Sequence, residues 1–174
     1  MIDLEKRMIS KAGGRFSVQI RDEDVHRFLS KVLHVDKQDC WIWGASENGR
    51  GYGQFYMKKR PWLAHRVSYS IFKGYIPSGM VVDHICHNRA CVNPHHLRLA
   101  TNQQNSQYRS GAAPRNSHSH VRNVYWLKDA KVWQVGIGLN HKYIYGGIFK
   151  SLDDAQECAR KMREKYFSPE FQGN

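Results

Sequence analysis

The fold of this chain is decided by VVDHICHNRACVNPHHLRLATNQQN, residues 81 to 105. Val81 and Val82 predict a short buried strand that leads into Asp83 and His84, and residues 97 to 100 can pair back as a second strand. Thr101 and Gln104 then have the form of a capping box, which opens a helix. The predicted order is strand, turn, strand, helix, and the chemically distinctive side chains all lie within it.

The turn of this stretch carries the spacing of a metal site. Cys86 and Cys91 lie five residues apart and His96 follows five residues later. These three side chains can surround one tetrahedral Zn²⁺ if a fourth sulfur or nitrogen joins them, and Cys40 is the best candidate. The alternative is that Cys86 and Cys91 are buried thiols, or a bridge that closes a short loop. Four protein ligands would leave no open position for water, so a zinc ion here would be structural.

A catalytic ion would therefore need different ligands. Asp83 ends the first strand, and Asn105 lies near the first turn of the following helix. If that helix packs across the hairpin, their oxygen atoms can bind a hard cation such as Mg²⁺ or Mn²⁺. His84 would then act as a general base towards a water molecule. The alternative for each residue is an ordinary structural or solvated role.

The charge around this stretch favours a polyanionic partner. Residues 50 to 109 contain nine Lys and Arg but a single acid, Asp83, and the whole chain has a formal charge of +12. Such a field attracts nucleic acid. We find no apolar run long enough to span a membrane and no secretion signal at the N-terminus, so we expect a cytoplasmic protein without a membrane partner.

Working outward, the flanks predict an α+β protein with two domains. We expect residues 1–21 to form a loosely held arm, and residues 22–110 to form the first domain. That domain should contain an amphipathic helix from residue 22 to about 33, strands at 41–43 and 52–56 around a Gly-rich turn, and a helix over 62–73. Residues 111–120 have linker composition.

The second domain, residues 121–174, should be a small three-stranded antiparallel sheet followed by a helix. The strands are expected at 123–127, 131–137 and 142–149, and the helix at 152–166. Ser151 and Asp154 form the N-terminal signature of this helix. Cys158 has no partner spacing and is interpreted as a small buried hydrophobe.

The first domain resembles the HNH and His-Cys box nucleases of the ββα-metal group, and in particular the HNH endonucleases of phage genomes, many of which are homing enzymes. The resemblance rests on Cys40-Trp-Ile-Trp, Gly51-Tyr-Gly, Ala64-His-Arg, Val82-Asp-His, Cys91-Val-Asn-Pro-x-His-Leu and Asn105. It implies a zinc-stabilised ββα-metal fold, with His84 as base, Asp83 and Asn105 as ligands of the catalytic ion, and Asn93 holding the turn. Its structural zinc ligands would be Cys40, Cys86, Cys91 and His96.

The resemblance also implies a basic residue that contacts the scissile phosphate. Arg60, before Pro61 and Trp62, is the closest match, while Lys59 and Arg66 compete with it; Lys58 is a further DNA-binding candidate. His65, His87 and His95 match no catalytic role, and we interpret them as structural or phosphate-facing.

The second domain resembles the AP2-like DNA-binding module, through Val121-Arg-Asn-Val-Tyr-Trp, Lys131-Val-Trp-Gln-Val-Gly-Ile and Tyr145-Gly-Gly-Ile-Phe. The resemblance implies a sheet that lies in the major groove of DNA. The side chains expected to contact it are Arg122, Tyr125, Trp126, Lys128 and Lys142. Trp133, in a Val/Ile alternation, is interpreted as core.

The combined expectation is a site-specific, metal-dependent endonuclease of double-stranded DNA that leaves 5′-phosphate and 3′-hydroxyl ends. A phage homing enzyme of this kind would act in the cytoplasm of an infected bacterial cell, as a monomer or as a homodimer. One alternative is a zinc-stabilised DNA-binding regulator without catalysis, which would have no use for an acid facing phosphate. A nuclease directed at RNA is another.

Overall fold

The computed structural model describes residues 8–10, 17–33, 36, 38–108 and 119–171. The chain divides into two compact units, Met1–Asn102 and Gln103–Asn174. Most of the predicted linker, 111–120, lies outside the described residues. Among the described residues, none of the helices has the length and apolar character to cross a membrane.

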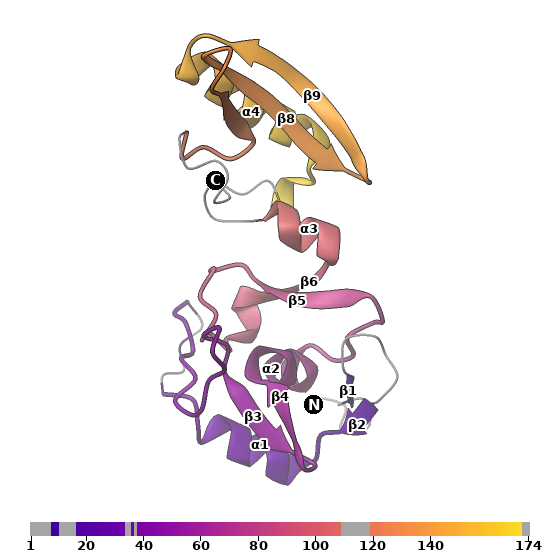
Figure 1. Cartoon of the computed structure of the whole chain (residues 1–174). Coiled ribbons are helices and arrows are strands. Elements are labelled where there is room, and N and C mark those ends of the chain that lie inside the picture. The colour runs from indigo at the N-terminus through magenta and orange to yellow at the C-terminus, as the bar shows by residue number, and fades with distance from the viewer. Residues whose placement is uncertain (1–7, 11–16, 34–35, 37, 109–118, 172–174) are drawn as a thin grey trace. The chain divides into compact units, whose positions relative to one another are not determined.

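Within its described residues, the first unit contains three two-stranded antiparallel sheets, the helices α1 and α2 and the short 3-10 helix η2 (Figure 1). In chain order the elements are β1 (Met8–Ser10), β2 (Ser17–Gln19), α1 (Asp22–Leu29), β3 (Gln54–Met57), β4 (Arg60–Leu63), α2 (Ala64–Phe72), β5 (Met80–His84), η2 (Pro94–His96) and β6 (Leu97–Thr101). The strands pair β1 with β2, β3 with β4 and β5 with β6. The predicted hairpin around the metal-site turn is thus confirmed as β5 and β6.

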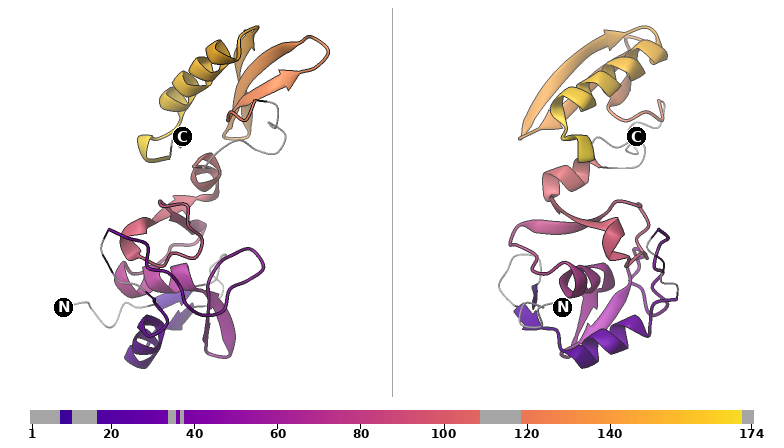
Figure 2. Two further views of the ribbon diagram at one scale, coloured as in Figure 1. Left: turned by 90° about the vertical axis from the view of Figure 1, so that its left-hand side faces the viewer. Right: turned by 180° about the vertical axis from the view of Figure 1, so that it is seen from behind.

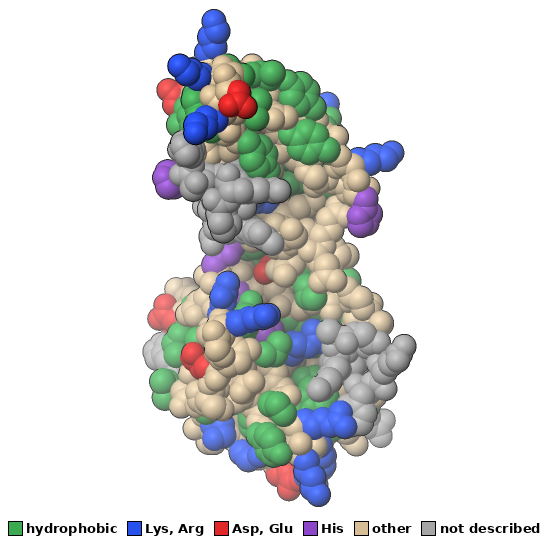
Figure 3. Space-filling view, viewed as in Figure 1, with side chains coloured by type: hydrophobic (Ala, Val, Ile, Leu, Met, Phe, Trp, Pro, Cys, Tyr) green, Lys and Arg blue, Asp and Glu red, His purple; other side chains and the backbone are tan. Residues whose placement is uncertain are grey.

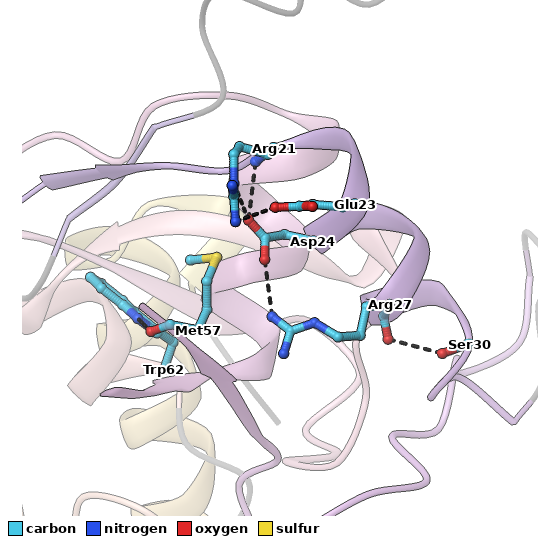
Figure 4. Close-up of polar contacts among 7 residues, drawn as sticks. All are labelled: Arg21, Glu23, Asp24, Arg27, Ser30, Met57 and Trp62. Carbon is cyan, nitrogen blue, oxygen red and sulfur yellow. Dashed lines mark hydrogen bonds and ion pairs between the residues drawn. The ribbon is translucent and has the colours of Figure 1, made fainter. Parts of the chain in front are cut away.

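Helix α1 begins where the chain supplies a carboxylate for its first turn. Asp24 is buried, and its side chain accepts a hydrogen bond from the backbone N–H of Arg21 and ion pairs with the guanidinium groups of Arg21 and Arg27 (Figure 4). The two cations offset the cost of burying a carboxylate. The helix ends at Leu29, four residues earlier than predicted, because Val32 leaves it to form a bridge with Trp43.

The predicted hairpin around the Gly-rich turn is wrong in its first strand, because Glu47, and not a residue of 41–43, pairs with Gly53 across that turn. Trp43 pairs with Val32 and Ile42 pairs with Cys91, while β3 pairs with β4. The ring of Trp43 packs onto Gly53 so closely that a Cβ atom there would lie 2.5 Å from it. The tryptophan therefore covers the end of the hairpin instead of extending it. Residues 62 and 63, predicted to be helical, belong to β4 and pair with Phe55 and Gln54 of β3.

Two short strands of the N-terminal segment, which was predicted to be a loosely held arm, contribute side chains to the core. Strands β1 and β2 bring Ile9 and Ile20 into the same apolar cluster as Phe28, Trp43 and Phe55. Both isoleucines are almost completely buried. The sequence signal was weak because each strand has only three residues.

The second unit consists of α3 (Asn102–Gln107), whose first residue precedes the division, β7 (Val124–Leu127), β8 (Val132–Leu139), β9 (Lys142–Phe149), α4 (Leu152–Tyr166) and η4 (Pro169–Phe171). The sheet order is β7-β8-β9, all antiparallel, and α4 covers one face of the sheet (Figure 2). Ser151 caps α4 by accepting hydrogen bonds from the backbone N–H groups of Asp153 and Asp154. The predicted strands and helix are confirmed.

Candidate functional site

Three cysteines and one histidine meet in the first unit. The ligand atoms of Cys40, Cys86, Cys91 and His96 all lie within 4.8 Å of one another. Nδ1 of His96 is 3.7 Å from Sγ of Cys40 and 3.6 Å from Sγ of Cys91. In a tetrahedral zinc site, bonds of about 2.3 Å to sulfur and 2.0 Å to nitrogen place the ligand atoms roughly 3.5–3.8 Å apart. The cluster is therefore compatible with zinc in both donor type and geometry.

The three sulfur atoms share their protons unequally. The thiol of Cys91 donates towards Cys86, which lowers the pKa of Cys86 to about 5 and raises the pKa of Cys91. Burial raises the pKa of the Cys40 thiol. Thiolates are the form in which cysteine binds zinc, so the lowered pKa of Cys86 favours binding of a cation by this sulfur.

Asn93 joins the two segments that carry these ligands. Its buried side chain donates hydrogen bonds from Nδ2 to the backbone oxygens of Asp36 and Asp39, at 3.1 and 2.7 Å. Its Oδ1 accepts from the backbone N–H of His95, at 2.9 Å. Asp39 immediately precedes Cys40, so one amide side chain links the loop before Cys40 to the turn that ends at His96.

Asp83 and His84 occupy the end of β5, opposite Arg98 and Leu97 of β6. Both side chains are buried. Nε of Arg98 donates to Oδ2 of Asp83 at 2.9 Å, which holds one oxygen of the carboxylate. A carboxylate oxygen is a ligand suited to a hard divalent cation, so the donor chemistry at Asp83 fits Mg²⁺ or Mn²⁺.

The imidazole of His84 is held by the backbone of the metal-site turn. Its Nε2 lies 3.1 Å from the carbonyl oxygen of Cys91. Because a carbonyl oxygen can only accept, Nε2 must carry the proton, and Nδ1 of the neutral ring has the free lone pair. Burial lowers the pKa of His84, and the charge of Arg89 contributes in the same direction. The neutral form is the one that can take up a proton.

An aromatic layer that sequence reasoning did not assign surrounds this ring. The ring centroids of His65 and Tyr52 lie 4.6 and 6.0 Å from that of His84. His65 is 4% exposed, burial lowers its pKa well below the usual range, and its Nδ1 has no hydrogen-bond partner among the described residues. The motif Ala64-His65-Arg66 was the sequence signal that could have pointed to His65. It did not indicate which strand the helix that carries it would face.

Lys58 and Lys59 form the two-residue turn between β3 and β4, with φ angles of 50° and 59°. Left-handed backbone is unfavourable for residues with side chains, and Asn or Gly is usual at such turns. Two lysines thus occupy the turn at a conformational cost, and Arg60 follows them at the exposed start of β4. Blue Lys and Arg side chains are distributed over the first unit in Figure 3.

Arg66 does not share this exposed position. It lies on α2 with 8% of its surface exposed, and desolvation lowers its pKa. Burial of this side chain argues against the surface phosphate contact predicted for it. Asn105 lies on α3, beyond the last residue of the first unit, and its pairing with Asp83 stays a prediction.

In the second unit the predicted DNA-facing residues fall on different surfaces. Trp126 contacts Trp133, with ring centroids 4.5 Å apart, and Trp133 packs against the core under α4. By strand alternation Tyr125 faces the opposite side. The guanidinium of Arg122 lies 5.5 Å from the ring centroid of Phe167. Lys128 and Lys142 are exposed.

The sequence did not predict that three large apolar side chains of β9 would be exposed: Tyr143, Tyr145 and Ile148. Tyr143 lies over Gly136 and accepts a hydrogen bond from Gln134, so it faces away from α4. Hydrophobic side chains (green) are visible over the second unit in Figure 3. A strand pattern does show alternation, but an exposed tyrosine and a buried one look alike in sequence.

Residues 63–107 match a family model described as HNH endonuclease. The chain is 39% identical over 70 residues to Protein 7.7 of Escherichia phage T7, covering 40% of this chain and 54% of that protein. It is 34% identical over 76 residues to Protein 2.8 of the same phage, covering 42% and 51%. It is also 44% identical over 70 residues to the uncharacterized gene 5.3 protein of Enterobacteria phage T3, covering 38% and 61%.

The chain thus spans between half and about three fifths of the length of these relatives. No solved structure shows a significant match. The matched family segment contains β5, the metal-site turn, β6 and α3. The segment that is similar to HNH endonucleases therefore includes Asp83, His84 and three of the four cluster residues, whereas Cys40 and Tyr52 lie outside it. The likeness of the second unit to AP2 modules is not supported by any of these matches.

Proposed function

We propose that this protein is a metal-dependent endonuclease that hydrolyses phosphodiester bonds of double-stranded DNA at a specific site, as a phage homing endonuclease does. The observation that carries the proposal is the orientation of His84. Its protonated Nε2 is bonded to the carbonyl of Cys91, which leaves Nδ1 as a base, and Asp83 is the preceding residue. The family match over residues 63–107 supports the same chemistry.

In the proposed reaction, Nδ1 of His84 accepts a proton from a water molecule, and the oxygen of that water forms a bond to phosphorus. The bond from phosphorus to the 3′ oxygen breaks, and that oxygen takes up a proton from solvent. The products are a 5′-phosphate and a 3′-hydroxyl. The carbonyl of Cys91 keeps the imidazole in one orientation and accepts a hydrogen bond from the imidazolium that forms.

Asp83 and, by the resemblance, Asn105 would hold a Mg²⁺ or Mn²⁺ ion, which when bound stabilises negative charge on the phosphate. Arg98 already holds Oδ2 of Asp83, so Oδ1 is the oxygen we assign to the cation. The cluster of Cys40, Cys86, Cys91 and His96 would hold a separate, structural Zn²⁺. Its three sulfur ligands make it a poor site for a hard ion.

We further propose that the second unit binds DNA through the sheet face opposite α4. Tyr125 and the exposed Tyr143 and Tyr145 lie on this face, and Lys142 lies at the start of β9. The AP2-like resemblance and the net charge of +12 support this role. Such a protein would act in the cytoplasm of an infected bacterial cell, and a single catalytic ion per chain would nick one strand as a monomer or cut both as a dimer.

The test is a plasmid assay. Supercoiled plasmid and phage DNA are incubated with the zinc-loaded protein in Mg²⁺, and His84→Ala and Asp83→Asn are compared with wild type. We expect either substitution to lower the nicking rate by about 100-fold or more. The control is His26→Ala, which removes an exposed histidine from α1 and should leave the rate unchanged.

A second function, a DNA-binding regulator without catalysis, is favoured by one observation. The Asp83 carboxylate already has a cationic partner in Arg98, so it does not depend on a metal ion to offset its burial. If wild type, His84→Ala and Asp83→Asn all bind duplex DNA equally and leave every plasmid intact, this second function replaces the first.

A further inference from the structure

Arg89 lies on the turn between Cys86 and Cys91 and is fixed there by two contacts. Its guanidinium carbon is 5.5 Å from the ring centroid of Tyr52, and its NH1 group donates to the backbone oxygen of Arg50 at 3.1 Å. The side chain is nevertheless exposed. A long cationic side chain that is both exposed and held has lost much of its rotamer freedom before any ligand binds.

The position of this cation relates it to the base. The ring of Tyr52 that carries the Arg89 guanidinium also contacts His84, with centroids 6.0 Å apart, and His65, with centroids 5.4 Å apart. Arg89 and His84 therefore share one aromatic neighbour. They also share the metal-site turn, because the carbonyl bonded to His84 belongs to Cys91, two residues beyond Arg89.

Arg60, the cation favoured by the motif alone, lies at the other end of its hairpin. The end of β4 that lies near His84 is the one followed by Ala64. The backbone N–H of Ala64 donates to the carbonyl of Gly53, which is next to Tyr52 in sequence. Arg60 pairs with Met57 at the opposite end, beside the turn of Lys58 and Lys59. At about 3.3 Å per residue, the three steps from residue 60 to residue 63 move Arg60 about 10 Å along the strand.

We propose that Arg89 contacts the scissile phosphate and stabilises the charge that develops there, a role that rests on the proposed nuclease function. A guanidinium group has five N–H donors, so the bond to the carbonyl of Arg50 leaves others for phosphate oxygens. The two contacts hold the group in place before the substrate arrives, which is the condition under which a cation contributes most to a transition state. Arg60, Lys58 and Lys59 would contact the DNA backbone further from the cleaved bond.

This role gives the cysteine cluster a second consequence. Cys86 and Cys91 are the two ligands on either side of Arg89 in sequence, so binding of a metal ion fixes both ends of the turn that presents the guanidinium. The charge beside the base thus depends on the same four ligands as the fold of the turn.

The experiment compares Arg89→Gln and Arg89→Lys with the matched variant Arg60→Gln, in zinc-loaded protein, on supercoiled plasmid with Mg²⁺. We expect the single-turnover nicking rate to fall about 100-fold in Arg89→Gln and to recover in part in Arg89→Lys, since lysine keeps the charge but loses the fork. Arg60→Gln should lower the rate by about threefold or less. Affinity for duplex DNA, measured without added Mg²⁺ and without a chelator so that zinc stays bound, should change by a similar small factor in both Gln variants.

Zinc content and melting temperature are measured for each variant, so that loss of the turn is not mistaken for loss of a contact. If Arg89→Gln retains zinc and nicks within about threefold of wild type, Arg89 has no catalytic role. A fall in rate of the same size in Arg60→Gln would also overturn the assignment, because the cation would not be specific. If wild type itself leaves the plasmid intact, the proposed nuclease function fails, and the catalytic role of Arg89 falls with it.

Discussion

The two units of this chain are stabilised in different ways. The second unit has one layer of helix on one sheet, in which Ala155 and Ala159 of α4 pack on Val124 and Val135. The first unit has an aromatic cluster around Phe28, Trp43 and Phe55, and a separate small cluster of Ile76, Val82 and Leu97 beneath the β5–β6 hairpin. Between β5 and β6, the buried residues of 85–96 are Cys91, Val92, Asn93 and Pro94.

The comparison indicates what the cysteine cluster would contribute to the first unit if it binds zinc. The turn of residues 85–96 has few buried apolar side chains, so apolar packing contributes little to holding it beside Asp83 and His84. The cysteine cluster can fix it with few residues. The second unit has no such requirement, because its exposed residues lie on a regular sheet. Four changes test this contrast, in order of decreasing effect.

Removal of a cluster ligand should destabilise the first unit and leave the second unit folded. Cys91→Ser replaces a soft thiolate by a hydroxyl, and zinc binding is typically linked to about 10–16 kcal/mol of folding free energy. We expect the first unit to lose its cooperative unfolding transition while amide resonances of β7–β9 stay dispersed, as measured by NMR and by zinc content. Cys158→Ser, which lies outside the cluster, is the control. Equal zinc content in the two variants would contradict the contrast.

Asn93→Ala should have the next largest effect. It removes two hydrogen bonds to the carbonyls of Asp36 and Asp39 and one from the backbone N–H of His95. We expect a loss of about 3 kcal/mol in the free energy of unfolding of the first unit, measured with urea, and a weaker hold on zinc in competition with a chelator. Asn88→Ala, which removes one bond to the N–H of Ala90, should cost clearly less.

Val135→Ala tests the second unit in the same way. Val135 is fully buried between the sheet and α4, so we expect a loss of about 2 kcal/mol there. Thermal unfolding followed by the signals of Trp126 and Trp133 measures it, and zinc content should not change. Val132→Ala, at a half-buried position, should have a smaller effect. A loss of zinc in Val135→Ala would mean that the two units are not independently stabilised.

The smallest expected change is a gain. His65→Phe keeps an aromatic ring against Tyr52 and His84 but removes a buried Nδ1 that has no partner among the described residues. We expect the free energy of unfolding of the first unit to rise by about 1 kcal/mol. His65→Ala, which also removes the ring, should lower it. A loss of stability in His65→Phe would indicate that the nitrogen is satisfied in the folded protein.

Local patterns predicted much of this architecture. The β5–β6 hairpin, the three strands of the second sheet and α4 follow from short-range signals such as alternation, turn residues and the Ser151 cap. The spacing of Cys86, Cys91 and His96 predicted their meeting, since all three lie in one turn. Cys40 could be added because the chain has few other cysteines.

Contacts between distant segments could not be predicted. The pairing of Ile42 with Cys91, the burial of Ile9 and the layer formed by His65, Tyr52 and His84 join segments whose separation in sequence carries no periodic signal. The hydrogen bond that orients His84 comes from a backbone carbonyl, which every residue has. The motif favoured Arg60 because it lies next to Pro61 and Trp62 in sequence. The proposed role of Arg89 rests on contacts with Tyr52 and Arg50 that only the structure shows.

Cys91 serves two centres through different parts of one residue. Its sulfur belongs to the cluster and its carbonyl oxygen meets the imidazole of His84. A substitution that removes the thiol leaves the backbone carbonyl in the chain. A rotation of the peptide plane at this residue would instead move the carbonyl away from His84 and the side chain away from the cluster. In the proposed mechanism, the main chain at position 91 would be the link through which a zinc ion at the cluster fixes the orientation of the base at His84.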